Sequence, residues 1–189
     1  MNVPAGFTLL LGGARSGKSA LAVALGRSWE GPVTLVATAR LHDDENNAND
    51  GDHDLAMRVA RHQAERPARW TTVETAGDVV GALRYSPSDT LVIVDCITLW
   101  VAAAFDQPDE LTIEADALTL ARVAASRPAP TVLISNEVGL GVHPSSDVGR
   151  RFRDTLGRVN TTLAAHAHRT LFLVAGRALR LDDPWSLLT

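Results

Sequence analysis

The sequence predicts an α/β fold in which helices flank a mostly parallel central sheet. Short apolar runs rich in β-branched residues alternate with longer segments of helical periodicity, which is the pattern of successive βαβ units. The run at residues 91–94 is apolar at every position, as expected for a parallel strand that is buried on both faces. A glycine-rich segment at residues 12–17 joins the first apolar run directly to the first helical segment.

The same patterns assign most of the chain to regular elements. Strands are predicted at residues 7–11, 33–37, 90–94, 131–135 and 170–174, and helices at residues 18–27, 54–65, 111–127 and 146–168. The apolar region at residues 91–105 is interpreted as a buried strand that leads into a further helix. In the last predicted helix an apolar stripe is expected to face the core, formed by Val148, Phe152, Leu156, Val159 and Leu163.

The composition limits the class of protein. With 46% hydrophobic and 21% charged residues, the chain is typical of a globular protein with its own core. The net charge of -4 argues against a nucleic-acid partner, which needs concentrated positive charge. The single cysteine, Cys96, favours a reducing, cytoplasmic compartment. No secretory signal is visible, and Asp95 interrupts the longest apolar region, so no membrane span is expected.

The most specific motif runs from Gly12 to Ser19 and has the Walker A pattern of Gly, four residues, Gly, Lys and Ser. Successive backbone N–H groups of such a loop form an anion nest, and the helix that follows directs its positive end at the same phosphates. Lys18 adds a positive charge near the β and γ oxygens of a nucleoside triphosphate, and the Ser19 hydroxyl is a ligand for Mg²⁺. Whether Arg15 contacts phosphate or solvent stays open at this level.

Asp95 closes the apolar run at residues 91–94 and is the second predicted contact to Mg²⁺. A carboxylate at the end of a buried strand is costly unless a cation or hydrogen bonds satisfy it. In P-loop enzymes an acidic residue in this place orients the metal. The sequence therefore predicts a P-loop NTPase, and residues 1–189 are expected to form a single nucleotide-binding domain with an acidic loop insertion near residues 43–53.

Several further segments resemble one family in the order in which that family has them. They are residues 12–19, 36–38, 58–62 with 66–74, 95–98, 135–141, and 151–154 with 157–160. On these segments the chain resembles the bifunctional adenosylcobinamide kinase and adenosylcobinamide-phosphate guanylyltransferase family. The resemblance implies a RecA-like sheet and covers nearly the whole chain.

The resemblance also implies two reactions and a set of site residues. A nucleoside triphosphate phosphorylates adenosylcobinamide, and GTP then donates GMP to the new phosphate through a guanylyl-histidine, with ATP or GTP as the phosphate donor. By position, His62 matches the guanylylated histidine, although periodicity alone favours a histidine packed beside the core with Leu55 and Val59. The implied nucleotide-binding residues are Gly12, Gly13, Ala14, Arg15, Ser16, Gly17, Lys18, Ser19, Val36, Ala37, Thr38, Gln63, Ala64, Glu65, Arg66, Glu74 and Asp95.

Three questions remain open from the sequence. Asn136 and Glu137 follow the predicted strand at residues 131–135, where parallel sheets bind ligands, but a turn function for Asn136 is an equal alternative. Relatives suggest a homotrimer, which periodicity does not address. The alternative functions are another P-loop small-molecule kinase without guanylyltransfer and a GTP-binding regulatory switch, although the chain lacks the Asn-Lys-x-Asp motif that reads guanine.

Overall fold

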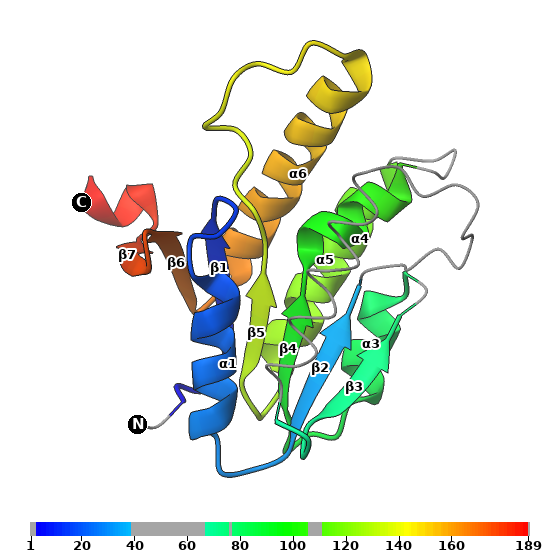
Figure 1. Ribbon diagram of the computed structural model, residues 1–189, viewed down its shortest axis with the longest axis vertical. Coiled ribbons are helices and arrows are strands. Elements are labelled where there is room, and N and C mark those ends of the chain that lie inside the picture. Colours follow the sequence, from blue (N-terminus) through cyan, green and yellow to red (C-terminus); the bar gives the residue numbers. More distant parts are fainter. Residues whose placement is uncertain (1–2, 39–66, 76, 106–110, 189) are drawn as a thin grey trace.

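The computed structural model describes residues 3–38, 67–75, 77–105 and 111–188, and within them the strands form one sheet (Figure 1). The strands are β1 (Phe7–Gly12), β2 (Val33–Ala37), β3 (Thr71–Glu74), β4 (Leu91–Asp95), β5 (Thr131–Ile134), β6 (Arg169–Val174) and β7 (Arg177–Leu181). Their order is β3-β2-β4-β5-β1-β6-β7. All neighbouring pairs are parallel except β6 and β7, so the predicted mostly parallel sheet is confirmed.

Helices cover both faces of the sheet, as Figure 1 shows. They are α1 (Lys18–Ser28), α3 (Val79–Tyr85), α4 (Ile97–Ala104), α5 (Leu111–Ser126), α6 (Asp147–His166) and the short 3₁₀ helix η1 (Pro184–Leu187). Successive strand residues point to opposite faces, so Leu9 packs in the core beneath α3, α5 and α6, while Leu10 packs in the core that contains α1. Both leucines are fully buried, as the continuous apolar runs predict.

The described elements that were not predicted as such are short or exposed. The edge strand β3 has the sequence TTVE and is mostly exposed, and β7 is exposed at every position. The short helix α3 begins at Asp78, whose side chain accepts a hydrogen bond from the Gly81 backbone at 2.7 Å. The helix predicted at residues 54–65 lies outside the described residues. No described helix is both long enough and apolar enough to cross a membrane.

The apolar stripe predicted for α6 is only partly correct. Leu156, Val159 and Leu163 are fully buried, but Val148 is 62% exposed. The helix begins at the cap residue Ser146, and its first turns extend beyond the end of the sheet (Figure 1). Periodicity gives the direction in which a side chain points, but it does not show whether another element lies there.

Replacing Gly26 with alanine is expected to lower the free energy of unfolding by about 1–3 kcal/mol, because the added methyl group overpacks the core around α1. A Cβ atom at Gly26 would lie 2.4 Å from Cζ2 of Trp70 and 3.2 Å from Cδ1 of Ile93. Both neighbours are buried, so neither ring nor methyl group has space to withdraw. Urea unfolding of the two proteins measures the difference.

Gly157→Ala is the matched control, because this helical glycine on α6 has no neighbour within 4 Å of an added Cβ. Alanine there is expected to raise the free energy of unfolding by up to about 1 kcal/mol through its better helix propensity. Equal stability of Gly26→Ala and wild type would contradict the packing that we describe between α1 and Trp70.

Candidate active site

The loop between β1 and α1 requires glycine at two positions. Gly12 has a φ of 148° and Gly17 a φ of 104°, and residues other than glycine rarely adopt either backbone conformation. A Cβ atom at Gly12 would lie 2.4 Å from the backbone oxygen of Leu173 and 2.8 Å from Oγ of Ser16. The loop therefore keeps its shape only because these positions carry no side chain.

Lys18 folds back over this loop. Its ammonium group donates hydrogen bonds to the carbonyl oxygens of Gly12 at 2.7 Å and Gly13 at 2.6 Å, and to Oγ of Ser16 at 3.3 Å. Burial lowers the pKa of Lys18, while the nearby acidic groups of Cys96 and Asp95 act in the opposite direction. An anion at the loop would stabilise the charged form, so the site is electrostatically suited to phosphate.

The turn between β6 and β7 supports the loop from the side. The backbone N–H of Gly176 donates to the carbonyl oxygen of Ser16 at 3.0 Å. Ala175 and Gly176 both have positive φ values, 51° and 72°, as in the tight two-residue turns that join antiparallel strands. A Cβ atom at Gly17 would lie 3.2 Å from Cα of Gly176, so the two backbones are in close contact. The sequence alone does not predict this contact, although a glycine shortly after the predicted strand at residues 170–174 is a signal for a turn.

Thr38, at the end of β2, is tied to the residues that follow β4. Its hydroxyl donates to the carbonyl oxygen of Cys96 at 2.6 Å and accepts from the Cys96 backbone N–H at 2.8 Å. The Thr38 backbone N–H donates to the carbonyl oxygen of Asp95 at 3.2 Å. Burial, with a further contribution from Asp95, raises the pKa of the Cys96 thiol to about 11, so this cysteine is a neutral neighbour of the site at physiological pH.

The two residues predicted to contact Mg²⁺ have suitable chemistry. Ser19 is the second residue of α1, next to Lys18, and Asp95 ends β4 near enough to influence the pKa of Lys18. A hydroxyl and a carboxylate are the hard oxygen ligands that Mg²⁺ accepts, with water and phosphate oxygens completing its shell. The described part of the chain has no group of three or more His, Cys, Asp or Glu residues placed to hold a metal by themselves.

The segment after β5 is fixed beside the loop. The Asn136 backbone N–H donates to Oγ1 of Thr98 at 2.8 Å, and its carbonyl oxygen accepts from Nδ2 of Asn160 at 3.0 Å. The next backbone N–H, that of Glu137, donates to the carbonyl oxygen of Gly12 at 3.2 Å. The backbone of Asn136 thus has a structural role, and Glu137 lies directly next to the predicted phosphate loop.

The other predicted nucleotide-binding residues lie along the same edge of the sheet or outside the described residues. Glu74 ends β3 and pairs in register with Ala37 on β2, and β3 lies four strand spacings, about 19 Å, from β1. The Val36 side chain is fully buried in the core, so it has no free surface for a ligand. His62, Gln63, Ala64, Glu65 and Arg66 lie outside the described residues.

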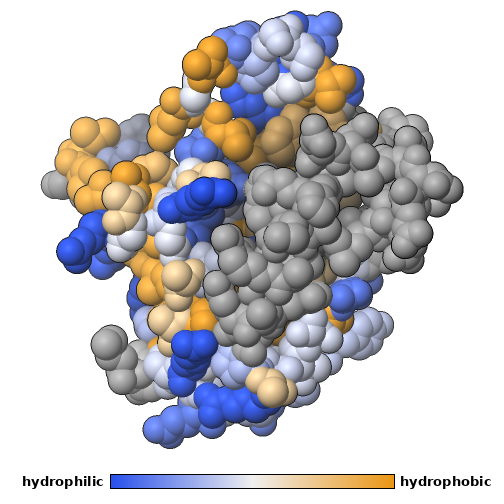
Figure 2. All heavy atoms as spheres, in the orientation of Figure 1, coloured by the Kyte–Doolittle hydropathy of each residue, from blue (hydrophilic) through white to orange (hydrophobic). Residues whose placement is uncertain are grey.

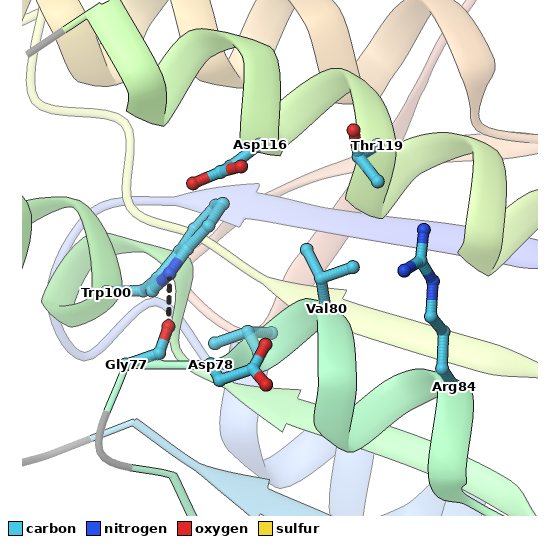
Figure 3. A pocket seen from close by; sticks show the side chains of 8 residues that line it. Gly77, Asp78, Val80, Arg84, Trp100, Asp116 and Thr119 are labelled. Carbon is cyan, nitrogen blue, oxygen red and sulfur yellow. Dashed lines mark hydrogen bonds between the residues drawn. The ribbon is translucent and has the colours of Figure 1, made fainter.

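A cavity of about 470 Å³ lies between α3, α4 and α5 (Figure 3). Nε1 of Trp100 donates to the carbonyl oxygen of Gly77 at 2.9 Å, and the Asp116 side chain on α5 points toward Trp100. These helices pack on the face of the sheet opposite α1. The cavity is lined by Gly77, Asp78, Val79, Val80, Arg84, Trp100, Asp116 and Thr119, so it contains none of the predicted site residues.

A family model described as cobinamide kinase / cobinamide phosphate guanyltransferase matches residues 8–181. The chain belongs to this family. The match begins in β1 and ends with the last residue of β7, so it includes the complete described sheet except for its first residue. The members of this family are transferases, and the predicted family membership is confirmed.

Two curated relatives of the cobinamide kinase / guanyltransferase family support the assignment over most of the chain. The bifunctional adenosylcobalamin biosynthesis protein CobP of Pseudomonas aeruginosa is 36% identical over 176 residues, which cover 92% of this chain and 95% of the relative. The corresponding protein CobU of Escherichia coli strain K12 is 35% identical over 189 residues, covering 92% of this chain and 98% of the relative.

Solved structures share the fold at much lower identity. An ATPase from the type III secretion system of pathogenic bacteria matches with a TM-score of 0.53 at 14% identity. The match covers 89% of this chain and 51% of the ATPase chain. A Pyrococcus horikoshii OT3 protein has a TM-score of 0.56 at 5% identity, with coverages of 95% and 87%. These similarities concern the fold alone, and they agree with the predicted α/β fold built around a mostly parallel sheet.

Proposed function

We propose that this chain phosphorylates adenosylcobinamide and then transfers GMP from GTP to adenosylcobinamide phosphate. The observation that carries the proposal is the family match over residues 8–181, which includes the strand, the loop and the helix of the nucleotide site. Both relatives are named as bifunctional proteins of adenosylcobalamin biosynthesis. A single domain over residues 1–189, working in the cytoplasm, is part of the same proposal.

In the first reaction the loop binds the triphosphate of ATP or GTP. Backbone N–H groups of the loop bind the phosphates in this proposal, and Lys18 exchanges its carbonyl partners for β and γ oxygens. Ser19 and Asp95 are the residues that would hold Mg²⁺, which would neutralise charge on the phosphate oxygens. The substrate hydroxyl oxygen forms a bond to the γ-phosphorus while the bond to the bridging oxygen breaks and the nucleoside diphosphate leaves.

In the second reaction His62 is the nucleophile. Its unprotonated ring nitrogen forms a bond to the α-phosphorus of GTP, and pyrophosphate leaves with the electrons of the broken bond. A phosphate oxygen of the substrate then attacks the same phosphorus and releases the imidazole. Residues 63–66, Ala37 and Thr38 at the end of β2, and Glu74 contact the nucleotide in this proposal.

Incubation with GTP, followed by mass spectrometry of the intact protein, is expected to reveal one added GMP. The adduct should be labile in acid and stable in base, as a phosphoramidate is, and it should map to His62. The variant His62→Ala is expected to form none. His166→Ala is the matched control, because His166 lies in the last turn of α6, outside the proposed nucleotide site.

Absence of an adduct on the wild type, or equal labelling of His62→Ala, would contradict guanylyltransfer through this histidine. Phosphorylation of adenosylcobinamide without any adduct would instead support a small-molecule kinase. Binding of GTP with neither reaction would support a regulatory switch.

We also propose that the chain forms a homo-oligomer, with a trimer as the state that the family resemblance implies. Exposed apolar side chains gather on β7 and η1, on the left of Figure 2. They are Leu179, Leu181, Trp185, Leu187 and Leu188, with Val174 beside them. Apolar patches of this kind commonly mark protein interfaces.

Leu179→Asp is expected to lower the mass in solution toward that of one chain, because the carboxylate would have to be desolvated in the interface. Light scattering after size exclusion measures that mass. Tyr85→Asp is the control, since Tyr85 is 89% exposed at the end of α3, remote from β7. An unchanged mass for Leu179→Asp would place the interface elsewhere.

A further inference from the structure

Glu137 lies at the centre of the carboxyl edge of the sheet. It follows β5, which is placed between β1 and β4 although these strands are far apart in the chain. Ile134 on β5 pairs in register with both Leu10 on β1 and Asp95 on β4. The residues after β5 therefore emerge between the phosphate loop and the proposed metal contact, where ligands bind in parallel sheets.

One carbonyl oxygen connects Glu137 to the phosphate-binding lysine. The oxygen of Gly12 accepts a hydrogen bond from the Glu137 backbone N–H at 3.2 Å and another from the Lys18 ammonium at 2.7 Å. The backbone of Glu137 thus lies beside the charge that faces the β and γ oxygens of a bound triphosphate.

Hydrogen bonds to Asn160 on α6 fix the segment that carries Glu137. Oγ of Ser135 donates to Oδ1 of Asn160 at 2.6 Å, and Nδ2 of the same asparagine donates to the carbonyl oxygen of Asn136 at 3.0 Å. Ser135 and Asn160 are both buried, so these bonds are protected from water. Thr98 at the start of α4 holds the Asn136 backbone from the other side.

We propose that the Glu137 carboxylate accepts the proton of the substrate hydroxyl during phosphoryl transfer, an inference that rests on the proposed kinase function. As the hydroxyl oxygen bonds to the γ-phosphorus, its proton passes to Glu137 and then to solvent, while the nucleoside diphosphate leaves. The side chain is half-buried, and Oε1 accepts the Gly139 backbone N–H at 2.6 Å. A carboxylate has about four acceptor positions, so this bond leaves capacity for a hydroxyl.

The two acidic residues at this edge have different roles in the proposal, Asp95 at the metal and Glu137 as the base. Asp95 ends a strand close to Lys18 and Ser19, in the place where P-loop enzymes orient the metal. Glu137 follows β5, the strand between those of Asp95 and Gly12, and its backbone N–H is bonded to the Gly12 carbonyl oxygen. A positioned general base of this kind contributes about 10²- to 10⁴-fold to a rate.

Glu137→Gln tests the inference, because the amide keeps the size of the side chain and its bond to Gly139 but accepts no proton. The kcat for phosphorylation of adenosylcobinamide is expected to fall by about 10²-fold or more. The KM for the nucleotide should stay within about twofold of wild type, since a carboxylate that acts only as a base adds little uniform binding. Labelling by GTP and transfer of GMP to supplied adenosylcobinamide phosphate should also be unchanged, because neither uses this proton.

Two further variants complete the experiment. Glu30→Gln makes the same chemical change after α1, at the opposite edge of the sheet, and should match wild type. Glu137→Asp returns a carboxylate and should retain more activity than Glu137→Gln. Wild-type kcat in Glu137→Gln, or an equal loss in both Glu137 variants, would overturn the assignment while the kinase function stands. No phosphorylation by the wild type would overturn the proposed function itself.

Discussion

Lys18→Ala is expected to lower the rate of phosphoryl transfer by about 10²- to 10³-fold, which is the cost of removing one preorganised group that stabilises developing charge. The ammonium already lies over the loop, 2.7 Å from the Gly12 oxygen and 2.6 Å from the Gly13 oxygen. Little rearrangement is therefore needed to bring it to a phosphate. Steady-state kinetics with ATP or GTP and adenosylcobinamide measures the loss.

Arg27→Ala is the control for this prediction, because it removes a cation from the opposite end of the same helix. That variant should retain nearly all of the activity. Unfolding curves for both variants separate catalysis from stability. A Lys18→Ala enzyme within tenfold of wild type would contradict the assigned phosphate contact.

Gly12→Ala is expected to destabilise the protein by about 3 kcal/mol and to abolish nucleotide binding, since backbone strain and overpacking each cost about 1–3 kcal/mol. The new Cβ would lie 2.4 Å from the Leu173 carbonyl oxygen, which belongs to β6, a strand paired on both sides, and cannot rotate away. The φ of 148° adds strain for any side chain. Urea unfolding and calorimetric titration with a nucleotide measure the two losses.

Gly13→Ala is the matched control for the loss of stability. An added Cβ at this exposed glycine has no neighbour within 4 Å. Its free energy of unfolding should stay within about 0.5 kcal/mol of wild type, as for most surface substitutions. Similar destabilisation of both variants would show that the contact between Gly12 and β6 is not the cause.

The features that the sequence predicted correctly are those with a local signal. The buried strands are continuous apolar runs, and the glycine-rich loop between β1 and α1 is a short motif with fixed spacing. In contrast, β3 and β7 lie at the edges of the sheet and are mostly exposed. Such strands need few apolar residues, so the hydrophobic pattern that would reveal them in the sequence is weak. Val148 shows the same limitation, because its exposure depends on where the sheet ends.

The candidate site could be predicted only in part, because its assembly depends on the order of the strands. The resemblance indicated Thr38, but only the structure shows that its side chain ties β2 to the residues after β4. The position of Glu137 beside Gly12 arises because β5 lies between β4 and β1. No spacing in the sequence gives that neighbour relation. The role of His62 stays a prediction, because this residue lies outside the described part of the chain.

The pairing of β1 has a consequence for how the protein is made. The ribosome produces β1 early, yet this strand pairs with β5 and β6, whose residues are added more than a hundred positions later. The amide of Gly176, which supports the Ser16 carbonyl, is added later still. Contacts of such long sequence separation form slowly. A growing chain therefore carries its glycine loop without a finished binding site until translation has passed β6, so a nascent chain stalled before that strand should not be retained on immobilised nucleotide.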